Sequence, residues 1–259
     1  MNNVFALSGV VIKELYRRKD FYVLFVLTAL ITLVLGSVNF FNDPKIVRYL
    51  KDICLLLIWI SSLVIAITTA ARQIPAEREN RTIFPLLAKP VTRGQVIVGK
   101  FTGCWLACGF VLLVFYLFFT IVSGTRERDW PLEATLKMAW LHWVMLGVVV
   151  AMVLFGSVVF SAPSANITIS FVVVIGILGL GRYLHRIALQ QSEPVNTILS
   201  AIYFAIPHLE WYDVRDFVVH EQRLASWFDC GLAGLYGAAY VVFFLCAAWV
   251  IFRRKTLTV

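Results

Sequence analysis

Apolar runs of about 20 residues alternate with short polar segments along much of the chain. Three of these runs, residues 21–41, 53–71 and 101–122, lie in the first half of the sequence. A fourth, residues 230–252, precedes three consecutive basic residues near the end. A helix of about 20 residues covers the hydrocarbon core of a bilayer, so each run predicts a membrane-spanning helix.

The segment 138–181 contains no Asp, Glu, Lys or Arg and is too long for one straight span. As a single helix it would measure about 66 Å, which is twice the thickness of the bilayer core. The sequence Ser-Ala-Pro-Ser-Ala-Asn at positions 161–166 supplies turn residues that divide it. We therefore expect two spans here, near residues 139–160 and 167–184, and six spans in all.

The beginning of the chain predicts an amphipathic helix over residues 4–19. Its apolar residues on one face are Val4, Leu7, Val11 and Leu15, and its basic residues toward the other are Lys13, Arg17, Arg18 and Lys19. Such a pattern is typical of a helix that lies at a membrane interface. No small-residue cleavage site follows, so we expect the helix to be retained rather than removed as a signal peptide.

The polar segment 72–100 interrupts the apolar first half and carries six basic and two acidic residues. Pro75 suits the first turn of a short helix, which would place Glu77 near the positive end of the helix dipole. Pro85 and Pro90 would end that helix.

A second helix is expected to begin at Arg93. Thr92 followed by Gln95 forms a capping-box pattern at the head of an apolar run, which predicts a helix that continues into the span at 101–122. The polar segment is therefore expected to be helix, break, helix.

The longest extramembrane segment, residues 182–229, precedes the last span. Apolar residues repeat at helical spacing over positions 195–206, and Pro207 ends the repeat. This repeat is too short to cross a membrane, so it predicts a helix at the outer interface. The aromatic residues expected at that interface are Trp211, Tyr212 and Trp227.

Composition and charge agree with an integral membrane protein. Of 259 residues, 60% are hydrophobic and 15% charged, against about 25% charged in soluble domains, and the mean hydropathy is +0.83. With both termini inside, the six spans put 13 basic residues (Lys and Arg) and 4 acidic residues on the cytoplasmic side. The outer side then holds 10 basic and 11 acidic residues. The net charge of +8 thus indicates orientation, with both ends in the cytoplasm, rather than nucleic-acid binding.

The polar segment 72–100 also resembles a known family. Its residues follow the form E-x-E, then T, an L-L pair, P-V-x-R and a G-K before the third span. The residues that match are Glu77, Glu79, Thr82, Leu86, Leu87, Pro90, Val91, Arg93, Gly99 and Lys100. The segment resembles the cytoplasmic coupling segment of ABC transporter permeases of the type-2 exporter class. Within that class the chain is most similar to permeases associated with copper-enzyme maturation and gliding motility.

This resemblance implies an all-α integral membrane protein of the bacterial inner membrane. It would have six transmembrane helices, an N-terminal elbow helix, a coupling helix between spans 2 and 3, and an outer interfacial helix between spans 5 and 6. The chain would be the permease subunit of an exporter or mechanotransmitter and would form a homodimer with two cytoplasmic ATPase subunits. ATP and magnesium would bind to the ATPase, so this chain is expected to have no catalytic residue, metal or cofactor of its own.

The resemblance also implies roles for named residues. Those expected to couple to the ATPase are Glu77, Arg78, Glu79, Arg81, Thr82, Leu86, Leu87, Pro90, Arg93 and Lys100. Those expected on the elbow helix are Lys13, Arg17, Arg18 and Lys19. Arg78 and Arg81 are expected to pair with acidic groups of the ATPase.

A second class of function stays open at this point. The chain would then be a membrane scaffold that docks an extracytoplasmic partner through residues 182–229 and transports nothing. The charge-free interior of the spans suits membrane lipids, other amphiphiles, or a protein that passes force and moves no substrate.

Two groups of residues carry soft metal ligands. Cys104 and Cys108 share one helix face, and Met138, His142, Met145 and Met152 share another, a pattern that copper(I) would use. Small thiols and methionines also fill gaps between helices, and we favour packing for both groups, with His142 at the outer interface.

The spacing from Gly94 to Gly99-Lys100 imitates a Walker A loop. Phe101 stands where such a loop needs Ser or Thr, and the intervening residues lie on a predicted helix. A regular helix cannot form the backbone nest that holds phosphate, so no nucleotide site is expected here.

Overall fold

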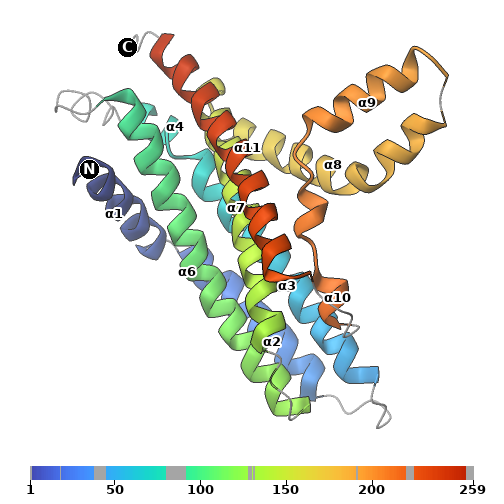
Figure 1. Ribbon diagram of the computed structural model, residues 1–259. Helices are drawn as coiled ribbons and strands as arrows, with labels where there is room; N and C mark the ends of the chain where they lie inside the picture. Colours follow the sequence, from blue (N-terminus) through green and yellow to red (C-terminus); the bar gives the residue numbers. More distant parts are fainter. Residues whose placement is uncertain are drawn as a thin grey trace.

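The computed structural model describes residues 2–17, 19–37, 45–79, 92–127, 130, 132–190, 192–219 and 225–254. Within these ranges the chain is helical, with no β-strand. The helices are α1 (Asn2–Arg17), α2 (Lys19–Ser37), α3 (Lys45–Ala71), α4 (Pro75–Glu79), α6 (Arg93–Glu127), α7 (Leu132–Val159), α8 (Pro163–Leu189), α9 (Val195–Ala205), the 3-10 helix η1 (Leu209–Tyr212), α10 (Arg215–Val219) and α11 (Trp227–Arg254). Figure 1 shows the start of α1, α4 and the end of α11 at the same end of the bundle.

Helix α7 forms the centre of the bundle. It packs against α3, α6, α8 and α11, and its side chains Met145, Leu146, Val149 and Leu154 are fully buried. Such complete burial follows from composition, because the helix is apolar on all sides and therefore has no face that prefers water.

Four of the described helices are long and apolar enough to cross a membrane. They cover Arg48–Arg78, Arg93–Thr125, Leu132–Val159 and Trp227–Arg254, and they contain most or all of the spans expected at 53–71, 101–122, 139–160 and 230–252. The spans expected at 21–41 and 167–184 fall on α2 and α8, whose described apolar parts are shorter, Tyr22–Val34 and Pro163–Gly179. The all-helical membrane architecture is thus confirmed, and the count of six spans stays a prediction.

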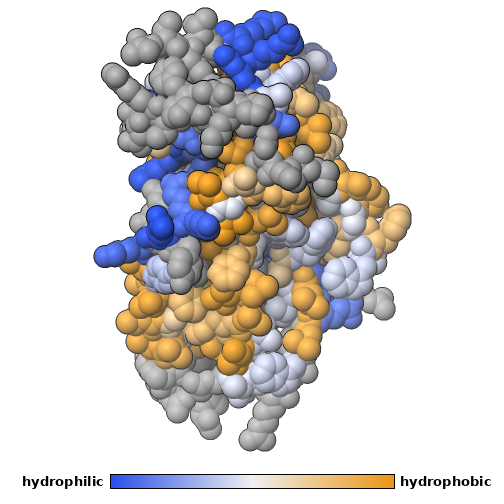
Figure 2. All heavy atoms as spheres, turned by 90° about the vertical axis from the view of Figure 1, so that its left-hand side faces the viewer, coloured by the Kyte–Doolittle hydropathy of each residue, from blue (hydrophilic) through white to orange (hydrophobic). Residues whose placement is uncertain are grey.

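The surface agrees with a lipid environment. On the face shown in Figure 2, hydrophobic side chains cover much of the lower half, and hydrophilic side chains gather mainly in the upper half. Helix α2 alone exposes Val23, Val26, Leu30 and Leu33 at more than half of their possible area. In water such an apolar face would be a liability, whereas hydrocarbon tails cover it at no cost.

The start of α6 confirms the predicted capping box. The backbone N–H of Thr92 donates to Gln95 Oε1 at 3.0 Å, and the backbone N–H of Gln95 donates to Thr92 Oγ1 at 3.3 Å. These two bonds satisfy donors that the first turn of a helix leaves free. From Arg93 the helix runs without a break for 35 residues, about 52 Å.

The predicted break between the fourth and fifth spans is also confirmed. Helix α7 ends at Val159 and α8 begins at Pro163, which suits the first position of a helix. Asn166, expected as a turn residue, is instead buried in the first turns of α8. Its side-chain Nδ2 donates to the carbonyls of Ala71 at 3.3 Å and Val153 at 3.2 Å, so one amide ties α8 to α3 and α7.

Helices α8 and α9 form a hairpin that extends to one side of the bundle (Figure 1). The helix predicted at 195–206 is confirmed as α9, and none of its residues is buried. Trp211 and Trp227 are half-exposed, as expected for interfacial residues, but Tyr212 is buried. Placing Tyr212 at the membrane interface was wrong, because its hydroxyl donates to the carbonyl of Ala233 in α11 at 2.9 Å.

Candidate functional site

The short helix α4 is joined to the long helix α6 by a buried ion pair. Pro75 opens α4 and Glu77 lies in its first turn, as predicted. The Lys100 ammonium lies 2.6 Å from Glu77 Oε1 and donates to Gln73 Oε1 at 3.2 Å. The Lys100 side chain is 5% exposed and that of Glu77 25%, so the pair is shielded from water on the lysine side.

Gln73 extends this connection to the preceding span. Its side-chain Nε2 donates to the carbonyl of Thr69 in α3 at 3.3 Å, while its Oε1 accepts from Lys100. A buried ammonium must be paired and hydrogen-bonded, and here one partner, Gln73, comes from the turn between α3 and α4 and the other, Glu77, from α4 itself. The three helices therefore meet at Lys100.

Helix α1 lies along the first half of α6. Ser8 Oγ donates to the carbonyl of Gly99 at 3.0 Å and lies 2.6 Å from Thr102 Oγ1. A Cβ at Gly103 would lie 2.9 Å from Ser8 Cα and 2.8 Å from Val11 Cβ, so the glycine allows the two backbones to approach closely. The contact confirms that Val11 of the predicted apolar face packs inward.

The helix expected over residues 4–19 ends at Arg17, so of the basic residues expected on the elbow helix Lys13 and Arg17 lie on α1 and Lys19 begins α2. Lys13, Arg17 and Lys19 are exposed, whereas Arg18 lies outside the described residues. The exposed residues lie close to where α1 passes into α2, and cations at that position can contact lipid headgroups or a partner.

The Arg93 side chain caps the C-terminal end of α11. Its Nη1 donates to the carbonyls of Phe252 at 2.5 Å and Arg253 at 3.2 Å, and its guanidinium carbon lies 5.5 Å from the centre of the Phe252 ring. A helix leaves its last carbonyls without intrahelical partners, and a cation there is favourable. Arg93 thus binds the end of α11 within the same chain.

Part of the expected coupling set lies outside the described residues. These positions are Arg81, Thr82, Leu86, Leu87 and Pro90, together with the side chain of Glu79. Among the described members, Glu77, Lys100 and Arg93 bind within the chain. Arg78 is half-buried, and its Nε and Nη2 have no hydrogen-bond partner among the described residues. A carboxylate from another chain would satisfy them.

His142 is buried inside the bundle, where α7 meets α3 and α6. Its Nε2 is 2.9 Å from Ser62 Oγ in α3, and its Nδ1 is 3.1 Å from the Tyr116 hydroxyl in α6. Met138 and Met145 are buried on either side of it along α7. Both ring nitrogens thus bind polar groups of neighbouring helices. The placement of His142 at the level of the outer interface stays a prediction, because burial among helices does not fix its depth in a membrane.

Both groups of soft metal ligands lie in the interior of the bundle. Cys104 and Cys108 are buried free thiols. Within the described ranges, no group of three or more His, Cys, Asp and Glu side chains is placed to hold a metal ion. The contacts of His142 and the burial of the thiols agree with the packing interpretation.

The segment expected on the outer side, residues 182–229, brings a charged pair into the bundle that sequence reasoning missed. Arg215 at the start of α10 donates through Nε and Nη2 to the two carboxylate oxygens of Asp213, at 2.8 and 3.0 Å. Its guanidinium carbon lies 4.7 Å from the centre of the Trp59 ring in α3. Burial lowers the pKa of Arg215, but the hydrogen bonds and charge of Asp213 outweigh it and leave the pKa raised. The outer segment is thereby attached to the second apolar run.

A comparison with models of known protein families identifies the family of the chain. The family model described as "ABC-2 family transporter protein" matches residues 52–257, from α3 to beyond the end of α11. Among curated proteins, no sequence matches the chain.

Proposed function

The chain belongs to the ABC-2 transporter family, and on this premise we propose that it couples ATP hydrolysis on a separate cytoplasmic ATPase to export or to the transmission of force. Membership makes it a permease component of an ABC transporter, with an ATP-binding cassette ATPase as its partner, and a multi-pass membrane protein. The route of coupling, the homodimer, the inner-membrane location and the cytoplasmic termini are parts of the proposal.

The observation that carries the proposal is the Lys100–Glu77 pair at 2.6 Å. Helix α4 is only five residues long and would move freely if its peptide connections alone held it. The ion pair fixes it to α6, which crosses most of the bundle. A displacement of α4 by an ATPase would therefore move α6 and, through Ser8 and Gly103, also α1.

Arg78 is the described residue best placed to receive the ATPase. It lies on α4 one position after Glu77, and its guanidinium has hydrogen-bonding capacity that the described residues do not use. An acidic group of the partner would form a charge-assisted pair with it. This supports the expectation that residues 77–87 form the contact.

The homodimer is supported by the amount of apolar surface that the single chain leaves open. Much of α2 and α11 is exposed, including Leu235, Val242 and Phe243 of α11. Lipid tails and a second copy of the chain would share these faces.

The proposal is tested by purifying the tagged chain from its native membrane and identifying co-purifying subunits by mass spectrometry. We expect an ABC ATPase at a 1:1 ratio, and we expect its hydrolysis rate in proteoliposomes to change when the permease is present. Arg78→Glu should reduce recovery of the ATPase by about tenfold or more, since a charge reversal at a desolvated contact costs roughly 2 to 5 kcal/mol. Arg72→Glu, at an exposed arginine just before α4, is the matched control.

Recovery of an outer-face protein without any ATPase would instead support the scaffold. In that case the exposed hairpin of α8 and α9 would be the docking surface. Normal ATPase recovery and coupled activity in the Arg78→Glu variant would contradict α4 as the contact.

A further inference from the structure

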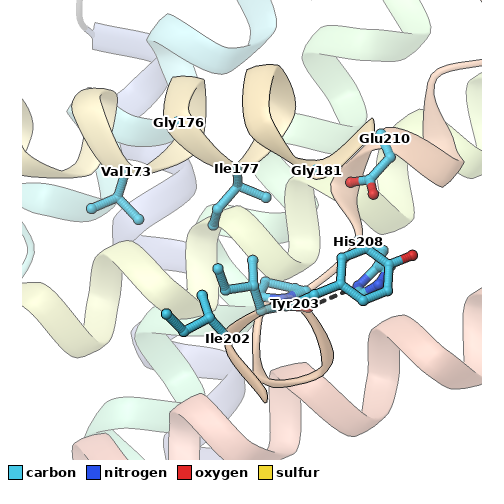
Figure 3. Close-up of a pocket in the computed structure, with 10 residues that line it drawn as sticks. Val173, Gly176, Ile177, Gly181, Ile202, Tyr203, His208 and Glu210 are labelled. Carbon is cyan, nitrogen blue, oxygen red and sulfur yellow. Dashed lines mark hydrogen bonds between the residues drawn. The ribbon is translucent and has the colours of Figure 1, made fainter. Parts of the chain in front are cut away.

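A cavity of about 260 Å³ lies between α8, α9 and η1. Figure 3 shows Val173 and Ile177 of α8 and Ile202 of α9 along its length, and Ile206 also lines it. An engineered apolar cavity of about 150 Å³ stays dry and takes benzene. The cavity between α8 and α9 therefore has room for a larger hydrocarbon group.

One end of this cavity is formed by the carboxylate of Glu210 in η1. The carboxylate lies directly against the backbone of α8 at Gly181, where an added Cβ would be 2.5 Å from Oε2 and 2.7 Å from Oε1. Only glycine leaves room for a carboxylate at this point. At Gly181, helix α8 therefore leaves a space that the Glu210 carboxylate of η1 occupies.

Glu210 Oε2 is buried and has no hydrogen-bond partner among the described residues. A buried carboxylate oxygen without a donor is unfavourable, and a positive charge is the partner it prefers. Arg215 is a nearby cation, but it directs Nε and Nη2 to Asp213. Glu210 is therefore left with an acceptor that a ligand can use.

A second cavity, of about 380 Å³, is also lined by Glu210. It is more open, and its walls include Trp59, Tyr183, Asp213 and Arg215. Glu210 lines both cavities, so an aliphatic compartment and a polar compartment meet at one carboxylate. A molecule that fills both must have a hydrocarbon part and a polar part.

We propose that the two cavities form a binding site for an amphiphile whose protonated amine pairs with Glu210 and whose hydrocarbon chain lies between α8 and α9. An amine is favoured over an anionic head because Asp213 and Arg215 neutralise each other, which leaves Glu210 as the charge to be met among the described residues that line the two cavities. The inference rests on the proposed function, since it names the class of compound that the permease would bind on the outer side.

The test uses the full chain in nanodiscs of phosphatidylcholine and phosphatidylglycerol, neither of which carries a primary amine. Octylamine and octanol, each with a photoactivatable diazirine on the chain, are the two probes. We expect the amine to label peptides that contain residues 173–177 and 202–206, and to half-saturate at a concentration about tenfold lower than the alcohol.

Glu210→Gln keeps the shape of the side chain and removes its charge. We expect it to abolish the preference for the amine and to leave labelling by the alcohol unchanged. Glu193→Gln, at an exposed acid before α9, is the control for general attraction of amines and should behave as wild type. Equal labelling by amine and alcohol in the wild type, or an unchanged preference in a folded Glu210→Gln variant, would overturn the proposal.

A pair of glycine variants tests the site from the opposite wall. Gly181→Ala would displace the carboxylate and should weaken amine labelling, whereas Gly179→Ala on the same helix meets nothing within 4 Å and should not. Competition by phosphatidylethanolamine would identify the natural occupant as a membrane aminolipid, and competition by free alkylamine alone would identify a separate amphiphile. Both support the site.

The outcome is separable from that of the proposed function. Absence of the amine preference in a preparation that still recovers its ATPase would refute this site and leave the permease role in place. Amine binding in a chain that recovers no ATPase would support this site and refute the permease role.

Discussion

Trp105 of α6 and Trp143 of α7 bind each other reciprocally. Each indole N–H donates to the backbone carbonyl of the other residue, at 3.0 and 3.2 Å, and the two rings stack with centroids 4.4 Å apart. Each ring also lies against a glycine on the opposite helix, Trp143 against Gly109 and Trp105 against Gly147. The spacing W-x-x-x-G occurs in both helices, so these four residues form a symmetric Trp clasp.

The Trp clasp is expected to stabilise the contact between α6 and α7. In Gly109→Ala the added Cβ would lie 2.6 Å from Trp143 Nε1, so the indole must move and its hydrogen bond to Trp105 is lost. Overpacking and one lost bond predict a loss of about 1 to 3 kcal/mol in unfolding free energy. Thermal unfolding in detergent measures this, with Gly231→Ala, which meets nothing within 4 Å, as the control. Equal melting temperatures of the Gly109→Ala and Gly231→Ala variants would show that the Trp clasp contributes little to stability.

The Lys100–Glu77 pair is expected to act as a unit. Lys100→Met leaves Glu77 without its cation, and Glu77→Gln leaves a buried ammonium without its anion, so each single change should destabilise the protein. We expect each single variant to lower the free energy of unfolding by about 1 to 3 kcal/mol. This loss is smaller than that for breaking a fully buried ion pair, because Glu77 is a quarter exposed.

The double variant separates this pairing from two independent effects. Lys100→Met with Glu77→Gln should be more stable than the sum of the single changes predicts, and ATPase stimulation should fall in all three variants. Additive losses in the unfolding measurements would mean that the two side chains do not interact in the membrane.

The orientation predicted from charge is tested with cysteines placed at described positions. In a Cys246→Ala background, which removes the exposed native thiol, Arg72→Cys and Arg254→Cys should be shielded from an impermeant thiol reagent in intact cells. Glu193→Cys should be labelled without lysis. Labelling at position 72 before lysis would reverse the topology.

The residues around His142 should respond to packing and hydrogen bonding rather than to copper. Met138→Leu and Met145→Leu nearly preserve the side-chain volume and should lower the free energy of unfolding by less than about 1.5 kcal/mol. His142→Leu removes the described partner of the buried Tyr116 hydroxyl and one of two described partners of Ser62, which still donates to the carbonyl of Trp59. It should therefore lower the unfolding free energy more, by about 1 to 3 kcal/mol. The measurement is thermal unfolding, together with activity at high and low copper. A stable Met145→Leu variant that loses copper-dependent activity would contradict the packing interpretation.

The parts of the fold that sequence reasoning predicted depend on signals within a few residues. Thr92 and Gln95 are three positions apart and bond to each other, and Pro163 lies at the helix start that it predicts. Helix α9 follows from apolar spacing between Pro194 and Pro207. In each case the cause of the boundary lies inside the segment itself, so the tertiary structure does not change it.

The missed features join residues that are distant in sequence. Asn166 was expected in a turn, yet its amide reaches the carbonyl of Ala71, which is free because α3 ends there. Glu210 and Gly181 similarly meet only because η1 folds back on α8. The W-x-x-x-G repeat was visible in the sequence, but pairing its two copies requires knowing that α6 and α7 are neighbours.

The unbroken length of α6 has a mechanical consequence. Arg93 lies 16 residues before Gly109, which corresponds to about 24 Å of α-helix. If the Trp clasp is the fulcrum, a tilt of about 10° moves the Arg93 end by about 4 Å, and the part of α6 beyond the clasp swings in the opposite direction. Since Arg93 binds the last carbonyls of α11, that helix would be pulled along. A small displacement of α4 would in this way move the two ends of α6 in opposite directions across the membrane.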